Sequence, residues 1–544
     1  MKIAIAQINS VLGDFELNYK KIMSAVKSAH KQNVDVVVFP EAALFGYHPV
    51  DLLERPDIVN KQISYIAKIQ KNMPKGIAAM VGAITKNPKI NGKAYNNSAV
   101  FIQQDKKPKI FAKQLLPTYD VFDEARHIEA GETAKNIFTY KGKKILVTIC
   151  EDIWAWPLPS LDSSPYKLNP LTKIKDKVDL VINLSASPFT HTKLKNRTYV
   201  TQQVVKQFKA PMIYANMVGA QDELIFDGAS FALSKTGKPL CQLADFEEDF
   251  KIVDIDSEPP KVVHKLKSQR LIRAQKALEC GLRDFVEKIG FKKVHLGISG
   301  GIDSALVATI AARAIGGDKL TLISMPGPYN SPKSHEASEK LAKNLGAEFI
   351  EIPIESYYKS LKTDLDKAFD VSEFSTMHEN LQARLRGMIL MAYSNKNNSL
   401  LLNTSNKSEF AMGYSTLYGD QCGGLSVIGD VLKTHVFKLA ELYNKHEEVI
   451  PRFIIDRPPS AELRPNQKDE DSLPPYEKLD PIITKLVENC KPARSALEKR
   501  VLKALLLTEF KRWQAPPILK ITDHAFGRGR RLPVVHRSHI GMSL

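Results

Sequence analysis

The chain has 544 residues, more than one ordinary domain holds, and its length predicts two to four domains, of which we expect two large ones. Hydrophobic residues make up 43% and charged residues 25%, without a Pro/Gly-rich tract, which excludes a largely disordered chain. The sequence has neither the pattern of a secretory signal nor an apolar run long enough for a bilayer. We therefore expect a cytoplasmic protein without a membrane partner.

Charge and cysteine content narrow the class further. Lysine and arginine number 77 against 60 aspartates and glutamates, a formal net charge of +17. This excess either attracts anionic partners such as nucleotides or nucleic acid, or forms a solvated basic surface. We expect no nucleic-acid partner, because no module with clustered basic and aromatic residues is visible. The five cysteines lack CxxC spacing, so we expect reduced thiols and neither disulfides nor a zinc site.

The first half alternates β-rich runs with amphipathic helical stretches. It opens with a predicted strand at 2–8, a helix at 15–32 and a strand at 34–40. Further strands are predicted at 78–84, 98–103, 145–150, 178–187, 211–219 and 229–235. Near residue 257 the composition changes, with a proline pair and four basic residues in 257–270. We predict one domain at 1–256, a linker at 257–275 and a second domain at 276–544.

A second series of helices and strands follows the boundary. In chain order we predict a helix at 271–290, a strand at 293–299, a helix at 304–315, a strand at 319–326, a helix at 333–346 and a strand at 348–354. This alternation is typical of a doubly wound parallel sheet, an α/β fold whose ligands lie beyond the carboxyl ends of the strands. Residues 458–476, rich in proline and charge, predict a long loop that is either a lid or a plain linker.

A glycine-rich turn, GISGGIDSA at 297–305, separates a predicted strand from a predicted helix. Backbone N–H groups and a helix N-terminus at such a place can hold an anion, although the turn is neither a Walker A loop nor GxGxxG. Asp303 is comfortable beside the helix dipole on structural grounds alone. Beside bound phosphates it would repel them unless a divalent cation lay between. Mg²⁺ bound together with a polyphosphate accounts for both the anion-binding turn and the carboxylate of Asp303.

The Ser-Gly-Gly-x-Asp-Ser run resembles the pyrophosphate loop of the ATP pyrophosphatases. With the segments at 379–395, 401–420, 460–477 and 525–533, it resembles the glutamine-dependent NAD⁺ synthetases over essentially the whole chain. The resemblance implies an adenine nucleotide alpha hydrolase-like second domain with ATP as co-substrate. It implies that the carboxylate of deamido-NAD (nicotinic acid adenine dinucleotide) attacks the α-phosphate of ATP, after which ammonia displaces AMP.

The same resemblance implies roles for individual residues. ATP contacts fall on Gly297, Ile298, Ser299, Gly300, Gly301, Ile302, Asp303, Ser304 and Thr404. Asp303 and Glu409 would hold Mg²⁺, and Asn380, Glu409 and Lys520 would contact deamido-NAD. Amide and ammonium groups suit an anionic dinucleotide, and carboxylates suit a hard cation. One departure is Ser405, which stands where the family has a glycine.

The stretch TICEDIW, residues 148–154, places Cys150 at the end of a predicted strand. Taken alone, such a cysteine is either a small buried hydrophobe or a reactive thiol. Together with Glu41 in VVVFPEAALFGY and Lys113 in FAKQLLPTYDVFDEARH, it resembles the nitrilase-like amidase domain, an αββα sandwich. That resemblance implies a Cys150 nucleophile, a Glu41 base and Lys113 charge beside an oxyanion. We expect Lys113 to lower the thiol pKa.

Glutamine contacts are implied for Tyr119, Ser187 and Lys193, although Tyr119 also fits a packed aromatic side chain. Glu151 and Asp152, directly after the cysteine, suit either the orientation of Lys113 or a helix start.

These resemblances together imply a two-site amidotransferase that forms NAD⁺ from deamido-NAD, ATP and glutamine and releases AMP, pyrophosphate and glutamate. They also imply a homo-oligomer, a dimer or larger. One alternative is another ATP-pyrophosphatase amidotransferase, such as a GMP or asparagine synthetase, against which the combination of Glu41, Lys113 and Cys150 argues. The other is an RNA-binding or RNA-thiolating protein, which would show salt-sensitive RNA binding without NAD⁺ formation.

Overall fold

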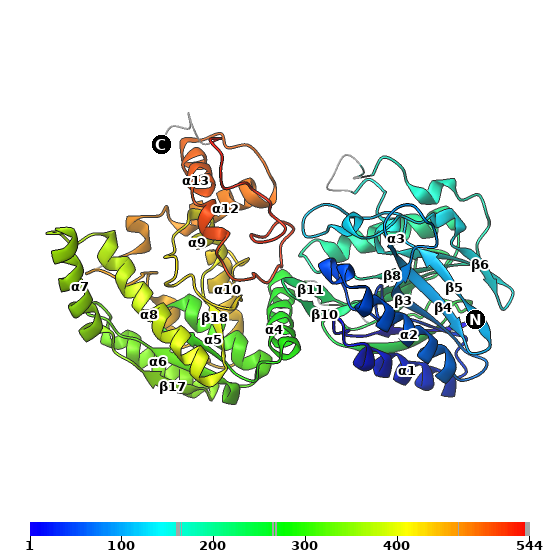
Figure 1. Cartoon of the computed structure of the whole chain (residues 1–544), viewed down its shortest axis with the longest axis horizontal. Coiled ribbons are helices and arrows are strands. Elements are labelled where there is room, and N and C mark those ends of the chain that lie inside the picture. The colour runs from blue at the N-terminus through cyan, green and yellow to red at the C-terminus, as the bar shows by residue number, and fades with distance from the viewer. Residues whose placement is uncertain (159–163, 165, 264–265, 267–268, 466, 539–544) are drawn as a thin grey trace. The chain divides into compact units, whose positions relative to one another are not determined.

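The computed structural model describes residues 1–158, 164, 166–263, 266, 269–465 and 467–538. The chain forms two compact units, Met1–Lys267 (unit 1) and Ser268–Leu544 (unit 2), and each is described by itself (Figure 1). Four residues of the predicted linker, 264, 265, 267 and 268, lie outside the described residues. Helix α4 (Arg270–Ile289) begins within the predicted linker.

Unit 1 contains two six-stranded sheets. The first has the order β14-β1-β2-β3-β4-β5, with β1 (Lys2–Gln7), β2 (Val36–Val38), β3 (Ala78–Lys86), β4 (Tyr95–Gln103), β5 (Lys106–Ala112) and β14 (Asp249–Asp254). The second has the order β13-β12-β9-β8-β7-β6, with β6 (Ile137–Tyr140), β7 (Lys143–Ile149), β8 (Leu180–Ser185), β9 (Met212–Asn216), β12 (Phe231–Leu233) and β13 (Pro239–Gln242). β10 (Val218–Gln221) and β11 (Leu224–Asp227) form a separate antiparallel pair.

The two sheets pack face to face between helices. Apolar side chains from both, including Ile3 and Ile182, form one buried cluster, because alternate residues of each strand point inward. Helices α1 (Phe15–Lys31) and α2 (Pro56–Asn72) cover the other face of the first sheet, and α3 (Lys193–Phe208) covers the other face of the second (Figure 1). The predicted αββα sandwich is confirmed.

Several strands of unit 1 were predicted from their apolar sequences, whereas others were not. The run at 211–219 divides into β9 and β10. The sequence prediction missed β5, β6, β11, β13 and β14. Strand β5 is largely exposed and reads KKPKIFA, so its lysines and proline obscure the alternation that identifies a strand.

Unit 2 is built on a five-stranded parallel sheet with the order β17-β16-β15-β18-β19. Its strands are β15 (Val294–Gly297), β16 (Leu320–Ser324), β17 (Glu348–Glu351), β18 (Leu400–Asn403) and β19 (Leu425–Ser426). The strand order reverses at β15, because β16 and β17 extend the sheet on one side and β18 and β19 on the other. Such a switch point leaves a crevice at the carboxyl ends of the two central strands, which are β15 and β18 here.

The helices of unit 2 surround this sheet. They are α4, α5 (Ile302–Ile315), α6 (Pro332–Leu345), α7 (Glu355–Phe369), α8 (Thr376–Asn397), α9 (Lys407–Met412), α10 (Lys433–Tyr443), α11 (Arg452–Asp456), α12 (Tyr476–Ile483), α13 (Ala496–Leu507) and α14 (Glu509–Arg512). Helix α5 packs on β15 and β16, and α8 packs on β15 and β18. The predicted doubly wound parallel sheet is confirmed. No helix among the described residues is long and apolar enough to cross a membrane.

Candidate active sites

Three buried side chains of unit 1 meet where strands end. Glu41 follows β2 and Lys113 follows β5, and both strands end at the same edge of the first sheet because β5 returns to the direction of β3. The Lys113 ammonium donates to Glu41 Oε1 at 2.8 Å, and the Ala186 backbone N–H donates to Glu41 Oε2 at 2.8 Å. Cys150 directly follows β7 with a φ of +41° and begins the short 3₁₀ helix η4 (Cys150–Ile153). The structure thus brings the three predicted catalytic residues together.

A second carboxylate, Glu124, belongs to the same cluster. Lys113 Nζ donates to Glu124 Oε1 at 2.8 Å, and the Tyr47 hydroxyl donates to the same oxygen at 2.7 Å. Sequence reasoning missed Glu124, since nothing in the spacing separates it from Asp120 and Asp123. Its burial, 7% exposed, is what distinguishes it.

The buried charges set the protonation state of the thiol. Burial, followed by the charge of Glu41, raises the pKa of Cys150 well above its ordinary value, although Lys113 acts in the opposite direction. Lys113 acts on the thiol pKa in the expected direction, but burial and the charge of Glu41 outweigh its effect, so the pKa of Cys150 is raised overall. Burial also raises the pKa of Glu41, and Glu124 adds to that effect against Lys113. The resting site holds a neutral thiol next to a carboxylate of increased basicity.

Asp152 ties the cysteine turn to the lysine segment. Its Oδ1 accepts the backbone N–H groups of Gln114 and Leu115, each at 2.9 Å, and its Oδ2 accepts that of Ile149 at 3.0 Å. Burial raises its pKa to about 6. Both interpretations from the sequence apply, because Asp152 lies in η4 and also holds the chain directly after Lys113.

Polar and aromatic groups gather on the residues that follow the cysteine. Glu151 Oε1 accepts the hydroxyls of Tyr119 at 2.7 Å and of Tyr166 at 2.8 Å. Tyr119 is 42% exposed, so it is not a core aromatic. The Lys193 ammonium lies 4.2 Å from the centre of a Trp154 ring.

Ser187 is buried in this half of the chain. Its backbone N–H donates to Asn216 Oδ1 at 2.9 Å, and its carbonyl accepts from Arg197 Nη2 at 2.6 Å. Arg197 in turn forms a fully buried ion pair with Asp227 at 2.6 Å. The position of Ser187 is therefore fixed by a polar network rather than by apolar packing.

In unit 2 a cavity of about 630 Å³ opens at the switch point between β15 and β18. The predicted ATP contacts that line it are Gly297, Ile298, Ser299, Gly301, Ile302, Asp303, Ser304 and Thr404. Gly300 does not line it. It has a φ of +74°, and a Cβ there would lie 2.7 Å from the Ser334 carbonyl oxygen, so a glycine is required. The turn GISGGIDSA forms one wall of the cavity, as its position after a strand predicted.

Asp303 and Glu409 converge on one lysine. Lys433 Nζ pairs with Asp303 Oδ2 and lies 3.4 Å from Glu409 Oε1, and Asn406 Nδ2 donates to Asp303 Oδ1 at 2.9 Å. Burial, followed by the charge of Asp303, raises the pKa of Glu409 to about 8. Lys433 was not singled out in the sequence. A cation between two carboxylates indicates that this place suits a positive charge.

Two further predicted residues of unit 2, Asn380 and Lys520, do not line the cavity in the part of the chain that the structure describes. Asn380 Oδ1 accepts the Thr416 hydroxyl at 2.7 Å. Lys520, which is 3% exposed, donates to the Asp523 carbonyl at 2.8 Å. Their contacts with deamido-NAD stay predictions. Ser405 is buried and its backbone N–H donates to Asn403 Oδ1 at 3.0 Å, so the serine fits where a glycine was expected.

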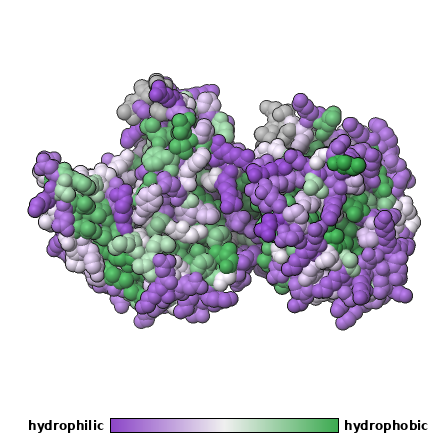
Figure 2. Space-filling model, viewed as in Figure 1, coloured by the Kyte–Doolittle hydropathy of each residue, from purple (hydrophilic) through white to green (hydrophobic). Residues whose placement is uncertain are grey.

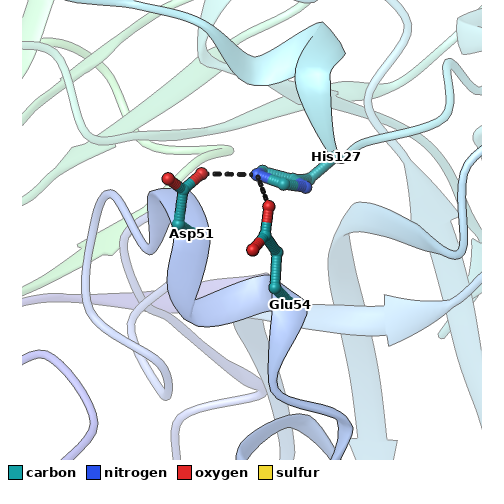
Figure 3. Close-up of side chains that lie close together, drawn as sticks. All are labelled: Asp51, Glu54 and His127. Carbon is teal, nitrogen blue, oxygen red and sulfur yellow. Dashed lines mark hydrogen bonds and ion pairs between the residues drawn. The ribbon is translucent and has the colours of Figure 1, made fainter.

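A further cluster of unit 1 contains Asp51, Glu54 and His127 (Figure 3). His127 Nε2 lies 2.9 Å from Asp51 Oδ1 and 4.0 Å from Glu54 Oε1. Arg126 lies 3.2 Å from the same Asp51 oxygen and 3.8 Å from Glu54. Because one guanidinium already pairs with both exposed carboxylates, we interpret the cluster as a surface ion-pair network.

Comparison with known proteins supplies the family. Residues 274–515 match the family model described as NAD synthase, and residues 2–259 match that of carbon-nitrogen hydrolase. The chain is 42% identical over 557 residues to a glutamine-dependent NAD(+) synthetase of a Synechocystis species, with 99% of each chain covered. It is 37% identical over 586 residues to one from Thermotoga maritima, again with 99% of each covered.

Solved structures agree with these matches. The glutamine-dependent NAD⁺ synthetase from Acinetobacter baumannii, in complex with adenosine diphosphate, superposes with a TM-score of 0.76 at 34% identity over 98% of each chain. A glutamine-dependent NAD(+) synthetase from Cytophaga hutchinsonii has a TM-score of 0.82 at 20% identity over 98% of each chain, a likeness of fold.

Proposed function

Because this chain belongs to the glutamine-dependent NAD⁺ synthetases, we propose that unit 1 liberates ammonia from glutamine and that unit 2 consumes it. The chain is a glutamine-hydrolysing, AMP-forming carbon–nitrogen ligase. It amidates deamido-NAD to NAD⁺ and releases AMP, pyrophosphate and glutamate. The predicted domains at 1–256 and 276–544, with their linker at 257–275, are the corresponding functional parts.

In unit 1, Cys150 Sγ attacks the side-chain carboxamide carbon of glutamine while Glu41 accepts the thiol proton. Lys113 stabilises the oxyanion that forms, and Glu41 returns the proton to the nitrogen as the C–N bond breaks and ammonia leaves. Water, deprotonated by Glu41, then cleaves the resulting thioester to glutamate and regenerates the thiol. The raised pKa of Glu41 supports this step, because a base of increased basicity accepts a thiol proton more readily.

Glutamine is a zwitterion, and unit 1 offers one charge for each end of its backbone. Lys193 suits the α-carboxylate, and Glu151 suits the α-ammonium. Tyr119 holds Glu151 through its hydroxyl, and Ser187 completes the glutamine site. Glu151 directly follows the nucleophile, and Lys193 lies against Trp154, four residues after it, which supports their place beside the glutamine site.

In unit 2, the backbone of 297–304 and Thr404 bind ATP, with the glycine turn at its phosphates. The carboxylate oxygen of deamido-NAD attacks the α-phosphorus and pyrophosphate leaves, after which ammonia attacks the acyl carbon and AMP leaves. Asp303 and Glu409 would hold Mg²⁺, because their carboxylates already converge on a cation. When bound, the ion supplies charge neutralisation for the departing pyrophosphate. Asn380, Glu409 and Lys520 bind deamido-NAD.

The remaining proposals concern partners and assembly. The partners are the small molecules deamido-NAD, ATP and glutamine, without nucleic acid or membrane, and the compartment is the cytoplasm. A homo-oligomer is supported by exposed apolar side chains on α8, where Met388 is 61% and Met391 is 42% exposed. Hydrophobic areas are visible on the face of unit 2 in Figure 2.

The observation that carries the proposed function is the buried Lys113 between Glu41 and Glu124, next to Cys150. The test is NAD⁺ formation by purified protein with deamido-NAD, ATP, Mg²⁺ and either glutamine or ammonium. We expect Cys150→Ala to lose synthesis from glutamine and to keep synthesis from ammonium. Cys241→Ala, in the same unit, serves as the matched control and should keep both. Loss of ammonium-driven synthesis in folded Cys150→Ala would contradict the division between the two units.

A further inference from the structure

The segment that carries Lys520 is a turn without regular secondary structure, residues 520–524. Directly before it, the chain runs beside β19, where the Leu519 backbone N–H donates to the Ser426 carbonyl at 3.2 Å. Beyond residue 519 the turn leaves the sheet edge. Its geometry therefore depends on side chains from elsewhere in unit 2.

Asp430 holds the backbone of this turn. Its Oδ2 accepts the N–H groups of Ile521 at 2.8 Å and Thr522 at 2.7 Å, and its Oδ1 accepts the Thr522 hydroxyl at 2.8 Å. Asp430 is 1% exposed. Burial favours its protonated form, but the charges of Lys407 and Lys520 outweigh that effect and lower the pKa of Asp430. An ionised, buried carboxylate thus replaces the hydrogen bonds that a strand or helix would have supplied.

Lys407 supplies the opposite charge. It is completely buried, and its ammonium lies 2.8 Å from Asp430 Oδ1 and 2.8 Å from Glu488 Oε1. The same ammonium donates to the Thr522 hydroxyl at 2.9 Å and to the His524 carbonyl at 3.0 Å. The Thr522 hydroxyl therefore links the two charges, accepting from Lys407 and donating to Asp430.

Lys407 also lies next to the residues proposed to hold Mg²⁺. It is the first residue of α9, directly after Asn406, whose amide donates to Asp303 at 2.9 Å. Glu409 lies two positions further along the same helix. One short stretch of chain thus contacts both the residues proposed for Mg²⁺ and the turn that carries Lys520.

We propose that Lys407 and Asp430 are positioning residues that fix Lys520, through the 520–524 turn, relative to the ATP-binding wall, and thereby set the affinity for deamido-NAD. This inference rests on the proposed function of unit 2. The pair does not touch the reacting atoms, and its effect passes through Thr522 and the backbone of the turn. Loss of the pair should weaken binding of the dinucleotide more than binding of ATP.

Thr522 offers the sharpest test, because two substitutions separate hydrogen bonding from packing. Thr522→Val keeps the volume and removes the hydroxyl between Lys407 and Asp430, whereas Thr522→Ser keeps the hydroxyl and removes a methyl group. With ammonium as the nitrogen source, we expect Thr522→Val to raise KM for deamido-NAD about 10-fold, as is usual for groups that orient a binding residue. Thr522→Ser should stay close to the wild type, and KM for ATP should change little in both.

Asp430→Asn is the second variant, with an expected increase in KM for deamido-NAD approaching about 100-fold. Glu509→Gln is its matched control in the same unit, since Glu509 forms a comparably buried ion pair with Arg512 at 2.8 Å. A general loss of rigidity would affect both variants alike, whereas the proposed role predicts a selective change for Asp430→Asn.

The outcomes distinguish a failure of the proposed function from a failure of the positioning role. If the wild type forms no NAD⁺, the proposed function fails and the positioning role fails with it. If the wild type forms NAD⁺ but Thr522→Ser is impaired as much as Thr522→Val, or Asp430→Asn behaves like Glu509→Gln, the positioning role alone is overturned. A selective rise in KM for deamido-NAD in Thr522→Val and Asp430→Asn supports it.

Discussion

The two sites of this chain handle charge in opposite ways. In unit 1, Lys113 is fully enclosed with Glu41 and Glu124, so the charged groups are provided by the protein itself. In unit 2, Asp303, Glu409 and Lys433 line a cavity of about 630 Å³ that a ligand can enter. The difference follows the substrates. An uncharged carboxamide brings no charge to its reaction, whereas a nucleotide brings phosphates and their counterions.

The comparison also explains which pKa values are shifted and why. Beside Lys113, burial and then the charge of Glu41 raise the pKa of the Cys150 thiol, which keeps its proton. Beside Lys433, burial and then the charge of Asp303 raise the pKa of Glu409 to about 8. The site of unit 1, which must provide a base, keeps its charged groups paired inside the protein. The site of unit 2, which must accept a cation, holds two carboxylates whose mutual repulsion a bound cation relieves.

The largest expected effect tests the proposed cation site of unit 2. Asp303→Asn should lower NAD⁺ synthesis about a thousandfold with either nitrogen source, because charge stabilisation by a metal is worth several kcal/mol. Glutamine hydrolysis, measured as glutamate release, should persist. Asp318→Asn, an exposed aspartate of the same unit, is the control. Substantial ammonium-driven synthesis in Asp303→Asn would remove this carboxylate from the mechanism.

The next effect concerns the enclosed charges of unit 1. Glu124→Gln should lower the rate of glutamine hydrolysis about 100-fold, because Lys113 loses one of its two carboxylate partners and the base loses its orientation. Synthesis from ammonium should be unchanged. Equal losses with glutamine and ammonium would show that the substitution damages the fold rather than the glutaminase site.

The pH dependence of glutaminase kcat/KM tests the raised pKa of Glu41. Glu41 must be ionised to accept the thiol proton, and burial and Glu124 raise its pKa. Glutaminase kcat/KM should therefore fall as the pH decreases through that raised value, earlier than for an ordinary carboxyl group. In Glu124→Gln the acidic limb should move to lower pH, whereas it should stay in place in Asp57→Asn, an exposed control on α2. An unmoved limb in Glu124→Gln would argue that another group controls it.

The smallest expected effect tests substrate recognition. Tyr119→Phe removes one of two hydroxyls on Glu151 and should raise KM for glutamine about 10-fold, since a hydrogen bond to a charged group contributes about 1.5–3 kcal/mol. Tyr65→Phe removes a comparable contact with Glu16 away from the site and should leave KM unchanged. An unaltered KM in Tyr119→Phe would place glutamine elsewhere.

Much of the fold and part of the site were predictable from the sequence. Glu41 and Lys113 follow strands that end at a common edge of the first sheet, and Cys150 follows β7 of the second sheet, which packs face to face with the first. Glu124 was missed because Glu41 was already assigned as the partner of Lys113. The sequence does not show how many carboxylates contact a buried ammonium group. The net rise of the thiol pKa was missed because the sequence does not show how deeply Cys150 is buried. Strand β5 was missed because its lysines and proline obscure the alternation that identifies a strand.

The left-handed backbone at Cys150 has a consequence for how this protein tolerates change. A φ of +41° disfavours every residue with a Cβ, at a cost of about 1–3 kcal/mol, and glycine alone would be relaxed there. Cys150→Gly would therefore remove the nucleophile and, at the same time, relieve the backbone strain. The backbone strain at this position is therefore retained together with the reactive side chain.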